Sequence, residues 1–244
     1  MNFLRVQLTK DDLEKLSEDE QIFLVQLTHL LNELNILQKC LIMSANGINT
    51  LNEIEKHGQV SLALFFLRLL AGKLYEGWKR LDKDFLQSNL YKSYEGELTP
   101  TGQESLRKLG DYFRGKNNLV NIVRNKFAFH YDKEKIKKEL LNVDKSENLE
   151  MFLSVEGGQG NCLYALSDLI VHRAMLRHAE PSNIGVALNK LMEEVVKNVT
   201  RWFLDFGGEY LLIIGKKLNV DYLKTEIPDP PLLSELRLPF FVKR

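Results

Sequence analysis

Residues 17–47 decide the fold, and they read SEDEQIFLVQLTHLLNELNILQKCLIMSANG. Ser17 followed three residues later by Glu20 is the pattern of a capping box, in which each side chain bonds the backbone N–H of the other residue. Apolar residues then recur at steps of three and four, and Asn46-Gly47 is a typical helix stop. We therefore expect one long helix with an apolar stripe formed by Ile22, Val25, Leu30, Leu34, Leu37 and Leu41.

Further helical patterns follow along the chain. A second long helix is expected from about Val60 to Leu90, and Gly72 and Gly77 are positions where another helix can approach it closely. Its apolar stripe consists of Leu64, Leu67, Leu70, Leu74, Trp78 and Leu81.

The middle of the chain carries several helix start signals. Thr99-Pro100 predicts a capped third helix that ends near Gly115. Either Asn117 or Asn118 is suited to cap a fourth. Asp132 starts the strongly charged run Lys133–Lys138, which we interpret as a solvated helix.

Residues 143–244 are less regular. Alternation of Met151, Leu153 and Val155 predicts a short strand or an extended piece, and residues 157–160 (Gly-Gly-Gln-Gly) predict a tight loop. Helical patterns return at 167–178 and at 183–217. From residue 219 the chain is rich in proline and in apolar residues, so we expect a tail that lies extended over the bundle or over a second subunit.

The predicted fold class is therefore mainly α: an antiparallel helical bundle with a small extended or β insert and an extended C-terminal tail. Residues 1–142 would form the bundle domain. Residues 143–218 would add the insert and helices that pack on the bundle, and residues 219–244 would form the proline-rich tail. Boundaries of this kind are good to about two to four residues.

Composition narrows the class of protein. The chain has 244 residues, 44% of them hydrophobic, and 33 Lys and Arg balance 33 Asp and Glu. Zero formal charge gives no support for non-specific nucleic-acid binding, although it leaves room for a local basic patch. The start of the chain lacks a secretory signal and no apolar run is long enough to span a membrane, so we expect a cytoplasmic protein without membrane contact. Cys40 and Cys162 are expected to be reduced thiols, and no metal-ligand spacing or cofactor motif is present.

Residues 124–130 combine reactive side chains most tightly. They begin with Arg124-Asn125 and end with His130, near the end of the fourth predicted helix. A guanidinium binds phosphate oxygens with paired hydrogen bonds, and an imidazole exchanges protons near neutral pH. Arg124 and His130 therefore form a candidate site for phosphate chemistry, with Asn125 as an orienting amide. On an ideal α-helix Arg124 and His130 would lie about 120° apart, which makes a site shared between two subunits attractive.

The stretch from Arg124 to His130 resembles the Arg-(four to six residues)-His signature of the HEPN (higher eukaryotes and prokaryotes nucleotide-binding) superfamily. A polar residue directly after the arginine, here Asn125, is typical of that signature, and the helical prediction agrees with the fold of the family. The resemblance implies a helical bundle that often dimerises with two motifs facing each other. It also implies a metal-independent endoribonuclease of toxin–antitoxin, abortive-infection or other defence systems, with RNA as substrate and an antitoxin or other partner protein. Arg124 and His130 would then be catalytic and Asn125 supporting.

The chain departs from that pattern in residues 143–244, which a simple domain of this family does not explain. A subset of toxins in the family carries His-x-Tyr, whereas here Tyr131 follows His130 directly. Two other interpretations stay open. One is a non-catalytic module that binds a nucleotide or a protein, and the other is a structural helical dimer in which Arg124 pairs with an acidic neighbour and His130 packs at a helix end.

A second group of basic residues lies at Arg173, Arg177 and His178. Arg173 and Arg177 are four residues apart and share a helix face. They would form either a phosphate-binding patch or, as most such faces do, a solvated surface.

Overall fold

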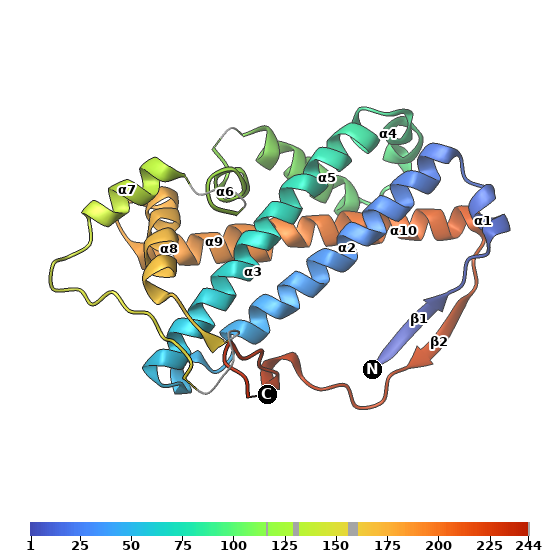
Figure 1. The fold of residues 1–244 in the computed structure, drawn as a ribbon. Coiled ribbons are helices and arrows are strands. Elements are labelled where there is room, and N and C mark those ends of the chain that lie inside the picture. Colours follow the sequence, from blue (N-terminus) through green and yellow to red (C-terminus); the bar gives the residue numbers. More distant parts are fainter. Residues whose placement is uncertain (116, 129–131, 156–160, 244) are drawn as a thin grey trace. The chain divides into compact units, whose positions relative to one another are not determined.

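The computed structural model describes residues 1–115, 117–128, 132–155 and 161–243, and this part of the chain is mainly α-helical, as predicted (Figure 1). None of its helices is both long and apolar enough to cross a membrane. The α-helices are α1 (Lys10–Glu14), α2 (Glu18–Ala45), α3 (Glu53–Arg80), α4 (Asn89–Tyr94), α5 (Pro100–Arg114), α6 (Leu119–Val123), α7 (Lys133–Leu141), α8 (Ala165–Ala179), α9 (Ile184–Leu191) and α10 (Thr200–Leu218). Three segments are π-helical, namely η2 (Leu81–Leu86), η4 (Arg124–Ala128) and η6 (Met192–Val199).

The chain forms two compact units, each assembled from segments far apart in the sequence. Unit 1 contains Met1–Asn35, Lys73–Lys116 and Asn198–Leu232. Unit 2 contains Ile36–Gly72, Asn117–Lys197 and Leu233–Arg244. Each unit takes segments from all three ranges predicted as domains, 1–142, 143–218 and 219–244, and that division stays a prediction.

The core of unit 1 is built around aromatic rings. The ring of Phe85 stacks on Phe23 at 5.1 Å between centroids and meets Phe206 edge-on at 5.2 Å. Trp78 stacks on Phe113, also at 5.1 Å. Such offset and edge contacts add stability beyond the area they bury. They join α2, α3, η2, α5 and α10 into one core.

The buried stripe of α2 agrees with the predicted one only in part. Leu34 and Leu41 are buried as predicted, but Ile22 and Val25 are exposed and Phe23, Leu24 and Leu27 are buried in their place. Residues 22–25 are all apolar, so the sequence does not distinguish the buried positions in the first turns of the helix. Leu30 and Leu31 lie close to glycines, because a Cβ added at Gly77 would lie 2.5 Å from Leu30 and one added at Gly207 would lie 2.5 Å from Leu31.

The predicted apolar stripe of α3 is confirmed, since all six of its residues are buried. The helix starts earlier than predicted, at Glu53, because Asn52 and Glu55 form a reciprocal capping box. It also stops being α-helical earlier, at Arg80, where the π-helical segment η2 begins. The remainder of the predicted range belongs to α4, which Ser88 caps.

Four of the predicted starts are confirmed by their capping hydrogen bonds. Thr99 caps α5 with Pro100 in its first turn, and Asn118 rather than Asn117 caps α6. Asp132 caps α7, and Asn183 caps α9. These polar side chains accept from backbone N–H groups that have no partner within the helix.

A two-stranded ribbon in unit 1 pairs β1 (Asn2–Val6) with β2 (Tyr222–Glu226) in antiparallel register (Figure 1). Every residue of both strands is exposed. No side of the ribbon faces a core, so the sequence lacks the alternation that marks most strands. Backbone pairing holds the ribbon, with Asn2 opposite Glu226 and Val6 opposite Tyr222.

The segment around Met151, Leu153 and Val155 forms no regular strand, so of the two predicted forms, a short strand or an extended piece, the extended piece remains. These three side chains are exposed, and the backbone bonds are made by Phe152, which forms an isolated antiparallel bridge with Leu163. The bridge joins only one pair of residues, so the alternating side chains do not form the buried face of a sheet. The predicted loop at 157–160 lies outside the described residues.

The end of the tail lies against helices of unit 2, as one of the two predicted alternatives stated. Asn46 donates to the carbonyls of Leu233 and Leu236, both at 2.8 Å. Gln59 donates to the carbonyl of Leu238 and accepts from the N–H of Phe240. Side-chain amides thus satisfy a backbone that its prolines keep out of regular structure.

Candidate functional site

The predicted motif begins at Arg124, which is the first residue of the π-helical segment η4 and directly follows α6. Asn118 accepts from the N–H of Asn121 at 2.8 Å and caps α6, whose first residue is Leu119. The expectation of a plain α-helix here is corrected. A π turn closes its bonds from i to i+5, so each residue turns by less than the 100° of an α-helix. Short π segments of this kind are frequent at functional sites.

Arg124 and Asn125 are brought together. Nη1 of Arg124 donates to Oδ1 of Asn125 at 2.9 Å, so the amide orients the guanidinium. Arg124 is half-buried and Asn125 is exposed. The third predicted residue, His130, lies outside the described residues.

Phe127 anchors this segment to the rest of unit 2. Its side chain is buried, and its carbonyl accepts from Nη1 of Arg68 on α3 at 3.3 Å. Arg68 was visible in the sequence only as a charge that interrupts an apolar run. Its place in the middle of a helix stripe is explained by this bond to η4, which the sequence does not reveal.

Helix α8 brings two histidines close to the same region. His172 is buried, and burial lowers its pKa to about 4, with the positive charge of Arg68 acting in the same direction and Asp168 opposing it. Within the described part of the chain, Nε2 of His172 has no hydrogen-bond partner. A neutral imidazole at this position fits the absence of a nearby acceptor.

His178 lies at the end of α8, beside the motif segment. Its ring centroid is 6.1 Å from that of Phe127. Burial lowers its pKa, the positive charges of Lys135 and Lys126 lower it further, and Asp132 opposes them. Burial is thus the main cause of the shift, and the two lysines add to it.

The two arginines of α8 are ion-paired. Arg173 holds both carboxylate oxygens of Glu147, with one N–O distance of 2.7 Å. Nε of Arg177 lies 3.1 Å from Glu139, whose side chain is only 3% exposed. Because the side chain of Arg173 is three-quarters buried, the expected solvated face is wrong at this position. The two arginines link α8 to residues 139–147 through ion pairs, and the spacing of residues in the sequence did not predict these partners.

The chain around the motif is locally basic. Residues 121–142 contain six Lys and Arg against three Asp and Glu, although the whole chain is balanced. One of the acids, Asp132, caps α7 and lies 3.4 Å from Lys126. A net positive segment of this kind favours an anionic ligand.

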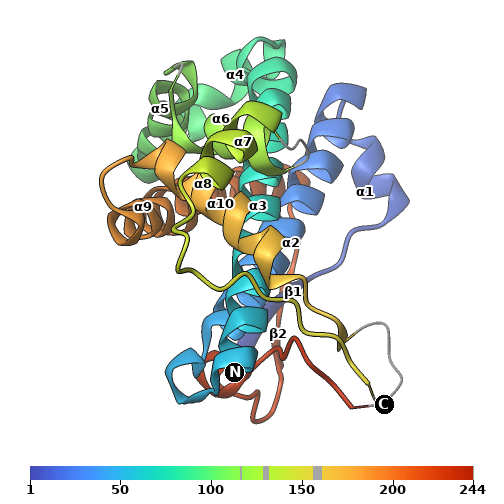
Figure 2. The ribbon, with the colours of Figure 1, turned by 60° about the vertical axis from the view of Figure 1, so that its left-hand side comes forward.

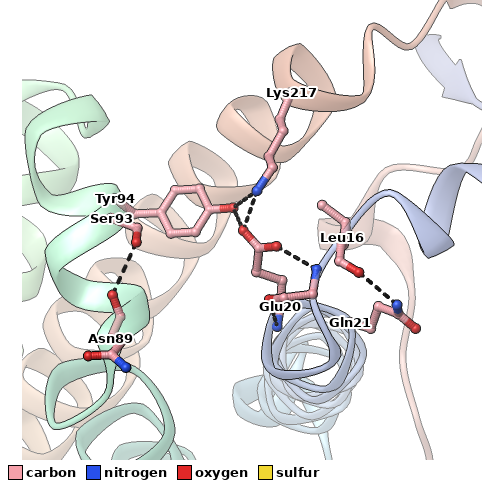
Figure 3. A network of polar contacts seen from close by, with 8 residues as sticks. Leu16, Glu20, Gln21, Asn89, Ser93, Tyr94 and Lys217 are labelled. Atoms are coloured by element: carbon pink, nitrogen blue, oxygen red, sulfur yellow. Dashed lines mark hydrogen bonds and ion pairs between the residues drawn. The ribbon is translucent and has the colours of Figure 1, made fainter.

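Another polar cluster lies in unit 1 and has the character of a structural contact (Figure 3). Glu20 on α2, Tyr94 on α4 and Lys217 on α10 meet there, with Lys217 Nζ 2.5 Å from Glu20 and 3.3 Å from the hydroxyl of Tyr94, which itself donates to Glu20. The other Glu20 oxygen accepts from the N–H of Ser17 at 2.7 Å, which completes the predicted capping box. Burial raises the pKa of Glu20, but the bonds from Lys217 and Tyr94 outweigh it and lower the pKa to about 2.

A scan against protein-family models, a search of curated proteins and a search of solved structures each find no match to this chain. The likeness of residues 124–130 to the HEPN signature therefore rests on those residues alone. Among the described residues, no three His, Cys, Asp or Glu side chains gather as ligands of a metal ion would. Both cysteines are free and half-buried.

Proposed function

We propose that this chain is a HEPN-like, metal-independent endoribonuclease with a toxin or phage-defence role, acting as a homodimer. The observation that carries the proposal is the hydrogen-bonded pair of Arg124 and Asn125 on a π-helical segment, within a locally basic stretch of an otherwise neutral chain. An oriented guanidinium suits phosphate, and RNA supplies its own nucleophile in the ribose 2′-hydroxyl.

In the proposed reaction, His130 accepts the proton of the 2′-hydroxyl as its oxygen attacks the adjacent phosphorus. The bond from phosphorus to the 5′-oxygen breaks, and that oxygen takes a proton as it leaves, either the one that His130 has accepted or one from water. Arg124 neutralises the charge that gathers on the phosphate oxygens, and Asn125 holds the guanidinium. The products are a 2′,3′-cyclic phosphate and a 5′-hydroxyl end.

The proposal is tested by cleavage of a labelled RNA pool in excess EDTA. Arg124→Ala and His130→Ala should each lower the rate by about a hundredfold or more, since a charge-stabilising donor or a general base contributes about that much. Arg80→Ala and His29→Ala are matched controls, because both side chains are well exposed in unit 1. A rate that survives both motif substitutions in folded protein excludes the proposal.

The alternative is a non-catalytic helical module that binds a nucleotide or a protein. The ion pairs of Arg173 and Arg177 favour it, because they neutralise much of the positive charge that α8 would offer to RNA. Folded wild-type protein that captures a specific partner and cleaves no RNA would support this function instead.

A further inference from the structure

A cavity of about 320 Å³ lies between α7 and α8, two helices that run side by side in unit 2 (Figure 2). Lys135, Lys138 and Glu139 line it from α7, and Arg177 and His178 line it from α8. On α7, Lys135 lies three and four residues before Lys138 and Glu139, and on α8, Ala174, which also lines the cavity, lies three and four residues before Arg177 and His178, so each helix turns one face toward it. The cavity is large compared with the roughly 30 Å³ that one water molecule occupies in the liquid.

Two of the five side chains form an ion pair with each other, and the other three do not take part in it. Glu139 is buried and pairs with Arg177, which cancels one positive and one negative charge and fastens the two helices. Neither Lys135 nor Lys138 pairs with a carboxylate in the part of the chain that the structure describes. Two ammonium groups therefore face the cavity with unused donors.

His178 adds a third donor to these two lysines. Its ring is half-buried and sits against Phe127 of η4, three residues after Arg124 in sequence. This ring contact connects the cavity to the segment that carries the proposed catalytic arginine. Cations that converge on a partly enclosed space strengthen one another's attraction for an anion, because the low dielectric around them reduces screening.

We propose that the cavity between α7 and α8 binds a phosphate group, held by the ammonium groups of Lys135 and Lys138 and by the imidazole of His178. The identity of the phosphate rests on the proposed function: it is a backbone phosphate of the RNA that Arg124 engages. Three donors from two helices suit the three or four oxygens that a phosphate presents. Arg177 stays committed to Glu139 and positions the walls of the cavity.

Phosphate binding should also change the protonation of His178. A bound anion favours the imidazolium form, so affinity should increase as the pH falls through neutrality. The other charged groups that face His178 come from α7, η4 and α8. They are Lys135, Lys138 and Glu139 on α7, Lys126 on η4, Asp132 at the start of α7, and Arg177 on α8.

The test is equilibrium binding of a labelled oligoribonucleotide with 2′-O-methyl groups throughout, which has no attacking hydroxyl and cannot be cleaved. The double variant Lys135→Gln/Lys138→Gln should bind it about tenfold more weakly, since a hydrogen bond to a charged group contributes substantially to binding. The slope of log affinity against log salt should become shallower by about 0.7 for each phosphate that the variant no longer neutralises. The matched control is Lys133→Gln/Lys137→Gln, which removes the same charge from exposed positions of α7 outside the cavity.

Equal weakening of binding by both double variants would mean that only the general charge of the protein matters, and it would overturn the proposal. The proposal would also be overturned if the cavity variant bound with wild-type affinity, or if the wild-type protein did not bind the oligonucleotide. Lys138→Gln alone, at an exposed position, keeps the test valid if the double variant is unstable. Competition by AMP or by inorganic phosphate at concentrations similar to the oligonucleotide would assign the site to a free phosphate compound rather than to an RNA backbone.

The outcomes separate this proposal from the ribonuclease. If the protein cleaves no RNA but binds the oligonucleotide through the cavity, the phosphate site is supported and the ribonuclease is excluded. If the protein cleaves RNA and the cavity variant binds as well as the wild type, the ribonuclease is supported and the phosphate site is excluded.

Discussion

The two polar clusters of this protein differ in how completely their charged groups are paired within the chain. In unit 1, Glu20 is buried and each of its oxygens is bonded, by Lys217 and Tyr94 on one side and by the N–H of Ser17 on the other. In unit 2, the α7–α8 cavity holds one ion pair and two lysines without carboxylate partners among the described residues. In the first cluster both carboxylate oxygens and the Tyr94 hydroxyl have partners within the chain, whereas the two lysines of the second have no carboxylate partner among the described residues.

The difference separates a contact that stabilises the fold from a surface that is available to a ligand. Buried charges are tolerated where their partners are complete, and removal of a partner is then costly. Cations without partners contribute little to stability and remain free for an anion. Substitutions in the two clusters should therefore differ strongly in their effect on unfolding.

The largest effect is expected for Glu20→Ala. It removes the ion pair with Lys217, the acceptor of the buried Tyr94 hydroxyl and half of the capping box. The free energy of unfolding should fall by roughly 3–4 kcal/mol, toward the lower end for a buried pair because Lys217 is partly exposed. Urea denaturation followed by circular dichroism measures the change.

Glu193→Ala is the matched control for that experiment. Glu193 also lies on a helix and pairs with a lysine, Lys197 at 2.7 Å, but both side chains are more than half exposed. An exposed pair of this kind contributes about 0–1 kcal/mol. Similar decreases in the two variants would contradict the view that burial and completeness distinguish the unit 1 cluster.

Acid should weaken unit 2 before unit 1. The pKa of His172 is about 4 in the folded protein and near its ordinary value when unfolded, so the unfolded chain takes up this proton first. Stability is therefore full above about pH 6.5 and falls by about 2–3 kcal/mol as the pH approaches 4. For Glu20, with a folded pKa of about 2, the stabilising effect is full above its ordinary pKa and declines below it.

Denaturation curves at a series of pH values test this order. His172→Leu should remove most of the decrease between pH 6.5 and 4.5, and Glu20→Gln should remove part of the decrease below pH 4.5. An unchanged slope near pH 5.5 in His172→Leu would show that another group takes up the proton.

A smaller effect is expected for Tyr94→Phe. The substitution keeps the buried ring and removes only the hydroxyl, while Glu20 retains Lys217 and the N–H of Ser17. Removal of one bond to a charged acceptor should lower the free energy of unfolding by about 1–2 kcal/mol. A decrease as large as that of Glu20→Ala would mean that the hydroxyl, rather than the lysine, compensates the buried carboxylate.

Local signals in the sequence predicted much of the fold. Caps at Thr99, Asn118 and Asp132 and the leucine stripe of α3 are recorded in neighbouring residues, and all are confirmed. The stripe of α2 was right at Leu34 and Leu41 but wrong at Ile22 and Val25, because residues 22–25 are all apolar and their partners lie far away in sequence. The ribbon of β1 and β2 joins the two ends of the chain without a buried face, so no local pattern marked it.

The candidate site was predictable only in part. Arg124 and Asn125 are neighbours, and their hydrogen bond follows from adjacency. The bond from Arg68 to Phe127 and the pairing of Arg177 with Glu139 join residues 59 and 38 positions apart, and no spacing rule reports them. The change from α to π geometry at Arg124 also depends on packing, since the residues of η4 have no composition that marks it.

The smallest effect concerns the potential in the α7–α8 cavity. Lys135 lowers the pKa of His178, so Lys135→Gln should raise that pKa toward its ordinary value, whereas Lys133→Gln, which does not line the cavity, should leave it nearly unchanged. Nuclear magnetic resonance titration of the imidazole signals measures both. Neither variant should change the free energy of unfolding by more than about 0.5 kcal/mol, because the substitution breaks no ion pair of either lysine among the described residues. Equal responses of His178 to the two substitutions would mean that its pKa is set by burial alone, and unit 2 would then offer an anion no more than an ordinary basic surface does.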